Sequence, residues 1–344
     1  NVAIGNYALY NARNNQNVAI GHEAGFYATG SQNTFIGKDA GKGGITSAPF
    51  SSGNLNTAIG YQALAGFTTA ESNVAVGREA GNDITTGTGN TLVGNQAGDK
   101  ITTAGYNAVF GAGALGAMAA DTNNNTAIGS FAMSSANNAD AIDNVAIGAY
   151  AGTGGTGALK RSIAIGKNAL NSTAGNDNTG AVAIGYNALT TLTTGAQNLA
   201  IGYEAGRTLS TGARNTFLGY EAGEDTTGGS DNTYLGNRAG GDHTGTYNTF
   251  VGSNTGKGVS GGSANGSSNT AVGYDALTAL TTGHQNVAIG FEAGEDITTG
   301  YYNTLLGYEA GENLTTGASN VFIGYEAGSG KIENQGAVAI GYRA

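Results

Sequence analysis

The chain of 344 residues contains no cysteine, no tryptophan and a single proline, and only 11% of its residues are charged. Without cysteine there is no disulfide framework. Disordered chains combine high charge with low hydrophobicity, whereas 39% of these residues are hydrophobic. No apolar run approaches the roughly 20 residues of a membrane helix. We therefore expect an ordered protein that does not insert into a membrane.

Basic residues are also scarce. The 14 Lys and Arg residues face 24 Asp and Glu residues, which gives a net charge of −10. Proteins that bind nucleic acids neutralise phosphates with clustered basic side chains, and the basic residues here are scattered. We expect no nucleic-acid partner, and an acidic surface that favours solubility.

Glycine is abundant, with 62 residues, and much of it belongs to a repeat. A short segment such as Asn198–Gly206 recurs 20 times, always with Gly at its fifth position and, except at Thr255, with Ala at its eighth. Ten of the 19 spacings are 17 residues. A fixed period of this kind is typical of repeat architectures. The copies begin at residues 1, 17, 33, 56, 73, 90, 107, 125, 144, 162, 181, 198, 215, 232, 248, 269, 286, 303, 320 and 337.

The residues within one repeat predict its local structure. Positions 1 to 4 are Asn followed by β-branched and apolar residues, which indicates a short strand. Gly at position 5 ends the strand, Ala at position 8 fits a crowded corner, and an apolar residue at position 12 indicates a second short strand. Helix is disfavoured because glycine recurs every few residues. The sequence predicts an all-β parallel β-solenoid of about 20 coils, with a modal repeat of 17 residues.

No linker or change of composition divides the chain, so we expect one continuous solenoid domain over residues 1–344. Two insertions interrupt it, at residues 42–55 and 257–268. The repeats are looser over residues 107–180, where the spacing is 18 or 19.

The faces of the strand suggest how chains associate. Asn at position 1 is expected to form a ladder of side-chain amides from coil to coil, and the apolar residue at position 4 is expected to fill the coil. Position 3 then points the other way, yet it is never charged. A strand that is apolar on both faces is buried on both, which predicts a homo-oligomer. The predicted seam between chains consists of Phe35, Leu92, Phe217, Tyr234, Phe250, Leu305 and Phe322.

The segments Ala181–Gly195 and Asn269–Gly283, with their Ala-Ile-Gly-Tyr or Ala-Val-Gly-Tyr cores and Thr-Thr-Gly ends, resemble repeats of phage tail-fibre and bacterial surface-fibre proteins. They are similar, more distantly, to the heads of trimeric autotransporter adhesins. The resemblance covers essentially the whole chain. It implies a left-handed β-roll in a homotrimer, located outside the cell, on its surface or on a virion, and usually concerned with attachment.

Three rows of side chains have alternative interpretations. Acidic residues recur at position 7, as in Glu204 and Glu221, and either bind Ca²⁺ through their carboxylates or form a solvated row; we favour the solvated row. Tyrosines at position 6, such as Tyr203, either stack on sugars or stiffen the solenoid by stacking on one another, and we favour stiffening. Thr-Thr pairs such as Thr85-Thr86 match an ice-binding array less well than ordinary exposed strand residues.

Enzymatic chemistry is not indicated. His22, His243 and His284 occupy three different repeat positions and have no partnered nucleophile. The segments Gly111–Gly116 and Gly152–Gly157 match a dinucleotide fingerprint, but that fingerprint works between a strand and a helix. We therefore expect no catalytic site, no cofactor and no metal.

The sequence thus predicts a non-enzymatic structural fibre, the shaft or head of an extracellular or virion attachment appendage. Its receptor, a cell-surface glycan or protein, is expected to contact the irregular loops, at Pro49, Phe50 and Lys257, since binding residues often lie on loops of a rigid scaffold. The alternative is a filament subunit that polymerises end to end, because open strand edges promote association.

Overall fold

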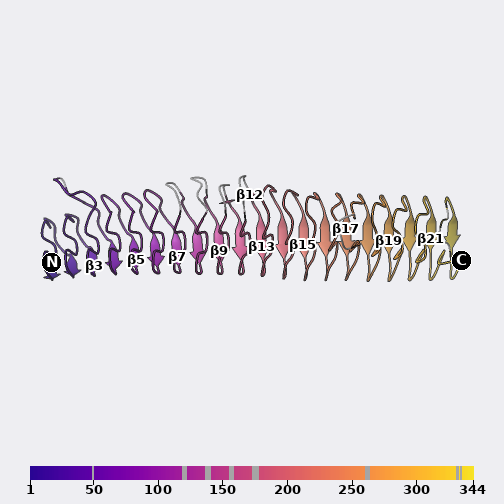
Figure 1. Cartoon of the computed structure of the whole chain (residues 1–344), viewed down its shortest axis with the longest axis horizontal. Coiled ribbons are helices and arrows are strands. Elements are labelled where there is room, and N and C mark those ends of the chain that lie inside the picture. The colour runs from indigo at the N-terminus through magenta and orange to yellow at the C-terminus, as the bar shows by residue number, and fades with distance from the viewer. Residues whose placement is uncertain are drawn as a thin grey trace. The chain divides into compact units, whose positions relative to one another are not determined.

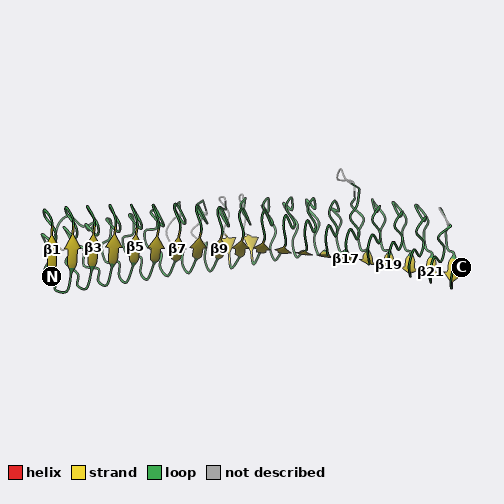
Figure 2. Cartoon of the chain, turned by 90° about the horizontal axis from the view of Figure 1, so that it is seen from below, coloured by secondary structure: helices red, strands yellow, loops and turns green. Residues whose placement is uncertain are grey.

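The computed structural model describes the chain except for residues 49, 118–121, 136–140, 155–158, 173–177, 260–263, 331–332 and 334. The described residues form strands, turns and loops and contain no helix (Figure 2). They divide into two compact units, Asn1–Thr179 and Gly180–Ala344. Each unit is a parallel β-solenoid, as the repeat predicts.

Each repeat supplies one three-residue strand, at its positions 2 to 4. In the first unit these are β1 (Val2–Ile4), β2 (Val18–Ile20), β3 (Thr34–Ile36), β4 (Thr57–Ile59), β5 (Val74–Val76), β6 (Thr91–Val93), β7 (Ala108–Phe110), β8 (Thr126–Ile128), β9 (Val145–Ile147) and β11 (Ile163–Ile165). Two shorter strands, β10 (Leu159–Lys160) and β12 (Asn178–Thr179), pair with each other.

The second unit repeats the arrangement. Its strands are β13 (Val182–Ile184), β14 (Leu199–Ile201), β15 (Thr216–Leu218), β16 (Thr233–Leu235), β17 (Thr249–Val251), β18 (Thr270–Val272), β19 (Val287–Ile289), β20 (Thr304–Leu306), β21 (Val321–Ile323) and β22 (Val338–Ile340). Within each unit, successive strands lie side by side in chain order (Figure 1). They pair in parallel and in register, so that Ala200, for example, faces Phe217.

The second strand predicted around position 12 is wrong for most of the described coils, because this part of the repeat forms bends and isolated bridges, and only β10 and β12 pair as strands there. The chain is nevertheless bonded there from coil to coil. The Thr281 amide donates to the Thr298 carbonyl at 2.9 Å, and the Thr281 hydroxyl donates to the same oxygen at 2.9 Å. Because threonine hydroxyls such as this one bond to the chain itself, this row is a poor template for ice.

The prediction of which strand face is buried is also wrong. Side chains at position 3 fill the interior of the coil, and those at position 4 point outward. Phe217 is fully buried, whereas Leu218 beside it is 40% exposed. The seven residues predicted to form a seam between chains all lie inside the coil, with at most 1% of their surface exposed, and have no surface to offer a second chain: Phe35, Leu92, Phe217, Tyr234, Phe250, Leu305 and Phe322.

The interior is narrow, and positions 3 and 9 share its space. In the coil that begins at Asn215, a methyl group added to Gly223 would lie 2.9 Å from the ring of Phe217. Each of the seven large residues at position 3 has Gly at position 9 of its own coil. In other coils the sizes are exchanged, and Ala183 is combined with Leu189. One large side chain from this pair of positions therefore fills each such coil.

The predicted ladder of asparagines is confirmed. The Asn215 amide NH donates to the side-chain oxygen of Asn198 at 2.9 Å, and the Asn215 side-chain nitrogen donates to the same oxygen at 3.1 Å. That nitrogen also donates to the carbonyl of Gly229 at 2.8 Å. Because these groups are buried, their hydrogen bonds avoid the cost of unpaired polar atoms.

Glycine at position 5 is required by the stacking. Gly202 has a φ of +143°, a conformation that side chains resist, and an added methyl group would lie 2.0 Å from the carbonyl oxygen of Gly219 in the next coil. The close approach of consecutive coils at this corner excludes any side chain.

The shared interior space predicts a strong coupling between Phe217 and Gly223. Phe217→Ala leaves a cavity and should cost about 3–5 kcal/mol of unfolding free energy. Gly223→Leu overpacks the coil and should cost about 1–3 kcal/mol. The double variant recreates the Ala183–Leu189 combination, so we expect it to be much more stable than the sum of the two losses. Chemical unfolding of the four proteins measures the coupling, and strict additivity would contradict the shared space.

Candidate functional site

Acidic side chains gather on the turns that follow several of the strands. In the described residues, three groups bring carboxylate or imidazole atoms within 4.8 Å of one another: His22 with Glu23 and Asp39, Glu204 with Glu221 and Glu224, and Glu292 with Glu295 and Glu312. Each group joins residues of neighbouring coils, because the same turn recurs directly above itself. We call them the first, second and third acidic clusters.

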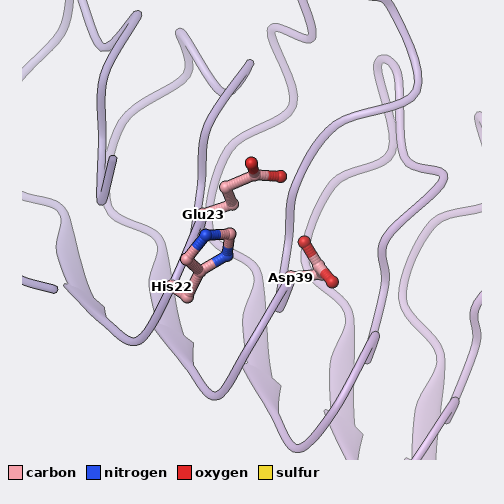
Figure 3. Close-up of side chains that lie close together, drawn as sticks. All are labelled: His22, Glu23 and Asp39. Carbon is pink, nitrogen blue, oxygen red and sulfur yellow. The ribbon is translucent and has the colours of Figure 1, made fainter. Parts of the chain in front are cut away.

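A lysine side chain, Lys42, forms ion pairs with the carboxylates of the first acidic cluster. His22 and Glu23 lie on one coil and Asp39 on the next (Figure 3). The Lys42 amine is 2.5 Å from a Glu23 oxygen and 3.4 Å from an Asp39 oxygen. The hydrogen bond from Lys42 lowers the pKa of Glu23. The lysine therefore neutralises the charge that would otherwise attract a metal ion.

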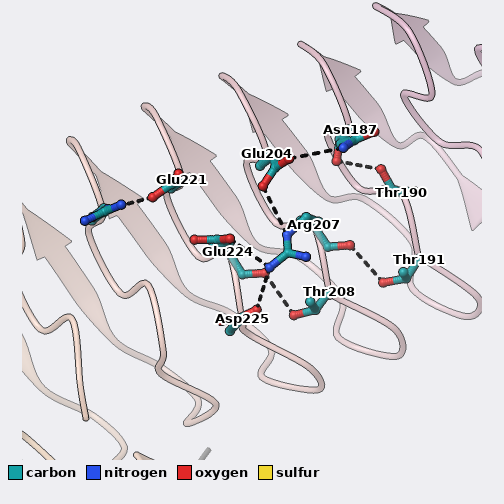
Figure 4. A network of polar contacts seen from close by, with 10 residues as sticks. Asn187, Thr190, Thr191, Glu204, Arg207, Thr208, Glu221, Glu224 and Asp225 are labelled. Carbon is teal, nitrogen blue, oxygen red and sulfur yellow. Dashed lines mark hydrogen bonds and ion pairs between the residues drawn. The ribbon is translucent and has the colours of Figure 1, made fainter. Parts of the chain in front are cut away.

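Arginines neutralise the second acidic cluster. The guanidinium of Arg207 lies between three carboxylates (Figure 4), at 3.3 Å from Glu204, 2.7 Å from Glu224 and 3.1 Å from Asp225. Arg238 reaches Glu221 at 2.6 Å. Burial opposes ionisation of Glu221, but hydrogen bonds from Tyr220 and Arg238 outweigh it and lower the pKa of Glu221.

The third acidic cluster has no ion pair with any Lys or Arg that the structure describes. Burial, together with repulsion from Glu292 and Asp275, raises the pKa of Glu295 to about 7. Carboxylate oxygens are the ligands that Ca²⁺ prefers, so these three residues are the ones best suited to hold such an ion. The solvated row expected from the sequence therefore differs from coil to coil in how its charge is balanced.

Tyrosines at position 6 stack on one another along the solenoid. Tyr203 lies 5.3 Å from Tyr186 and 5.2 Å from Tyr220 between ring centroids, with nearly parallel planes. A ring in the middle of such a row has a neighbour over each face and exposes its edge and hydroxyl group. This geometry favours mutual stiffening and leaves interior rings no free face for a sugar.

The predicted contact loops lie in separate units. Phe50 is half-buried, and its ring stacks on Tyr27 at 5.8 Å with the Arg13 guanidinium 5.8 Å from its centroid. Pro49 lies outside the described residues. Lys257 lines a polar cavity of about 210 Å³ together with Glu224, Asp225, Arg238, Gly241 and Asp242. Both described residues are thus held against the solenoid.

The three histidines do not come together. His22 belongs to the first acidic cluster, His284 stacks on Tyr301 at 5.1 Å, and His243 is fully buried. His243 takes the interior place that Leu or Ile fills elsewhere. Gly245 donates a hydrogen bond of 3.3 Å to its Nδ1, whereas its Nε2 is buried without a hydrogen-bond partner.

Sequence reasoning missed this polar patch in the core. Polar side chains interrupt the otherwise apolar or alanine rows in the interior of the second unit, at Thr226, Tyr234, His243 and Thr255. The signal was visible as departures from the repeat at positions 3, 8 and 12.

Comparison with known proteins adds no identification: no protein-family model and no curated protein matches the chain. Among the described residues there is no helix long and apolar enough to cross a membrane.

Buried His243 predicts acid sensitivity. Burial lowers its pKa from 6.5 to about 4, so the unfolded chain binds a proton at a higher pH than the folded chain does. Through this residue, the free energy of unfolding is at its full value above pH 6.5. It falls by about 3 kcal/mol in total as the pH falls toward 4. Thermal unfolding between pH 7 and 4 should show it.

The control is His243→Leu, which introduces the apolar residue found at this repeat position in other coils, such as Leu209. Its stability should fall less steeply over the same pH range. Equal slopes for the two proteins would show that His243 does not titrate in this way.

Proposed function

We propose that the chain is a non-enzymatic structural fibre that assembles as a left-handed homotrimer and forms the shaft or head of an extracellular or virion attachment appendage. The observation that carries the proposal is the outward face of the parallel sheet in each unit. Position 4 on this face is Ile, Val, Leu or Phe in all 20 repeats.

This outward face is apolar and open to solvent in the single chain. Phe110 is 41% exposed in the first unit, and Ile289 is 42% exposed in the second. Position 2, on the same face, is Val, Thr, Ile, Leu or Ala and never carries a charge. Large apolar patches are rare on soluble monomers and usually mark an interaction surface.

A second copy of the chain is the partner that fits this face best. The face repeats at the spacing of the coils, so a partner with the same period can match it over its length. Identical subunits commonly associate with closed symmetry, and the resemblance to trimeric fibre repeats favours three chains. This seam replaces the one at position 3 that the sequence suggested.

A role in attachment follows from the resemblance and from the insertions. The regular coils offer the same surface again and again, whereas the loops at residues 42–55 and 257–268 differ from the repeat. We propose that the receptor contacts these loops. Of the residues predicted to contact it, the structure describes Phe50 and Lys257.

The seam is tested by placing a charge on the outward face. Leu218→Asp should weaken assembly and leave the coil folded, because the side chain is outside the interior. Light scattering at several concentrations measures the oligomeric state, and circular dichroism measures the fold. A fixed trimer and an open-ended polymer differ in how mass depends on concentration.

Thr227→Asp is the matched control, since Thr227 is an exposed loop residue of the same repeat. It should leave the oligomer unchanged. A wild-type chain that is monomeric at all concentrations, or a Leu218→Asp variant that keeps the wild-type mass, would refute the proposed seam.

Attachment is tested separately by whole-cell and glycan-array binding. We expect binding by the wild-type protein and its loss when residues 257–268 are replaced by the short connection found between other coils. The matched variant shortens residues 42–55. Binding that survives both deletions, in proteins that remain assembled, would exclude the loops as the contact.

A further inference from the structure

Four pairs of exposed tyrosines are stacked on neighbouring coils of the second unit. Their ring centroids are 4.9 to 5.3 Å apart, and their planes differ by 5 to 18°. Every ring is at least 39% exposed. The pairs are Tyr186–Tyr203, Tyr203–Tyr220, Tyr308–Tyr325 and Tyr325–Tyr342.

Most of these hydroxyl groups have a carboxylate beside them. The residue after Tyr220, Tyr308 and Tyr325 is a glutamate, and a hydrogen bond to that glutamate raises the pKa of each phenol. The phenol therefore stays protonated at neutral pH. When such a phenol loses an electron, its proton has an acceptor already in place.

We propose that these tyrosine ladders are sites of oxidative coupling, at which a one-electron oxidant joins rings of adjacent coils as dityrosine. Each of two phenols loses one electron and its hydroxyl proton to become a phenoxyl radical. The two radicals form one carbon–carbon bond between ring carbons next to the hydroxyl groups. The hydrogen on each bonded carbon then returns to its own oxygen as a proton.

The reaction balances with hydrogen peroxide as the oxidant and a haem peroxidase as its catalyst. Two tyrosines give up two electrons and two protons in total, and one peroxide takes them up to form two waters. The coupled pair is lighter than two tyrosines by two hydrogen atoms.

Proximity favours coupling within the ladder over coupling between molecules. Holding two reactants side by side makes their encounter effectively unimolecular, and the parallel register places each ring over the same atoms of the next. The bond spans two coils 17 residues apart, so it closes a loop in the unfolded chain and should stabilise the folded one.

The chain also provides natural breaks. Phe291 stacks between Tyr274 and Tyr308 at 5.3 and 5.1 Å but has no hydroxyl group. Tyr106 is 69% exposed, and Gly89 and Asn124 hold the corresponding places in the neighbouring coils. We expect neither Tyr274 nor Tyr106 to couple within the chain.

The experiment treats the full chain with peroxide and a haem peroxidase at low protein concentration. We expect dityrosine fluorescence in the band that keeps the mass of a single chain on a denaturing gel. Peptide mapping should assign the cross-links to the four pairs. The variant with both Tyr203→Phe and Tyr325→Phe removes one member of each of the four pairs and should lose the intrachain cross-links assigned to them.

Two further variants sharpen the test. Tyr106→Phe removes a more exposed tyrosine outside the ladders and should leave the signal unchanged. Phe291→Tyr extends one ladder and should add cross-links to Tyr274 and Tyr308. The proposal is overturned if the double variant keeps the wild-type signal, or if the cross-links lie mainly between chains. These readouts do not depend on whether the chain is an attachment fibre.

Discussion

Parallel stacking in register places every side chain on the equivalent side chain of the next coil. A residue type therefore suits this fold only if its side chain can pack against the same side chain in the next coil, about 4.8 Å away. Asparagine does so because its amide both donates and accepts hydrogen bonds. Glycine at position 5 does so because nothing projects from it toward the carbonyl of the next coil, as at Gly202 and Gly219.

The interior obeys a second constraint, which is the limited space inside the coils. A single strand and the segment that returns to it enclose too little space for two large side chains. Phe217 is therefore combined with Gly223, and Leu189 with Ala183. Where both positions are small, as at Ala200 and Gly206, the large side chains of the neighbouring coils, Leu189 and Phe217, lie against the glycine.

The repeat period, the strand at the start of each repeat, the parallel register and the asparagine ladder could all be predicted from the sequence, because each follows from a local pattern. The choice of the buried face could not be made from alternation, which places Phe217 and Leu218 on opposite faces without saying which is inside. The exchange of sizes between positions 3 and 9 carried that information. The ion pairs of Arg207 and Lys42 depend on how long side chains bend toward the next coil, which no spacing in the sequence specifies.

The acidic row shows what happens where stacking on the same residue is unfavourable. A carboxylate only accepts hydrogen bonds, so two glutamates at coil spacing repel each other. Arg207 and Arg238 relieve the repulsion in one stretch, whereas around Glu295 it contributes to the raised pKa. The tyrosines beside these acids have no such conflict, because flat rings stack and their hydroxyl groups donate to the carboxylates. The register that brings like charges together in the acidic row therefore also brings the aromatic rings together. The hydrogen bond from phenol to glutamate links the two rows.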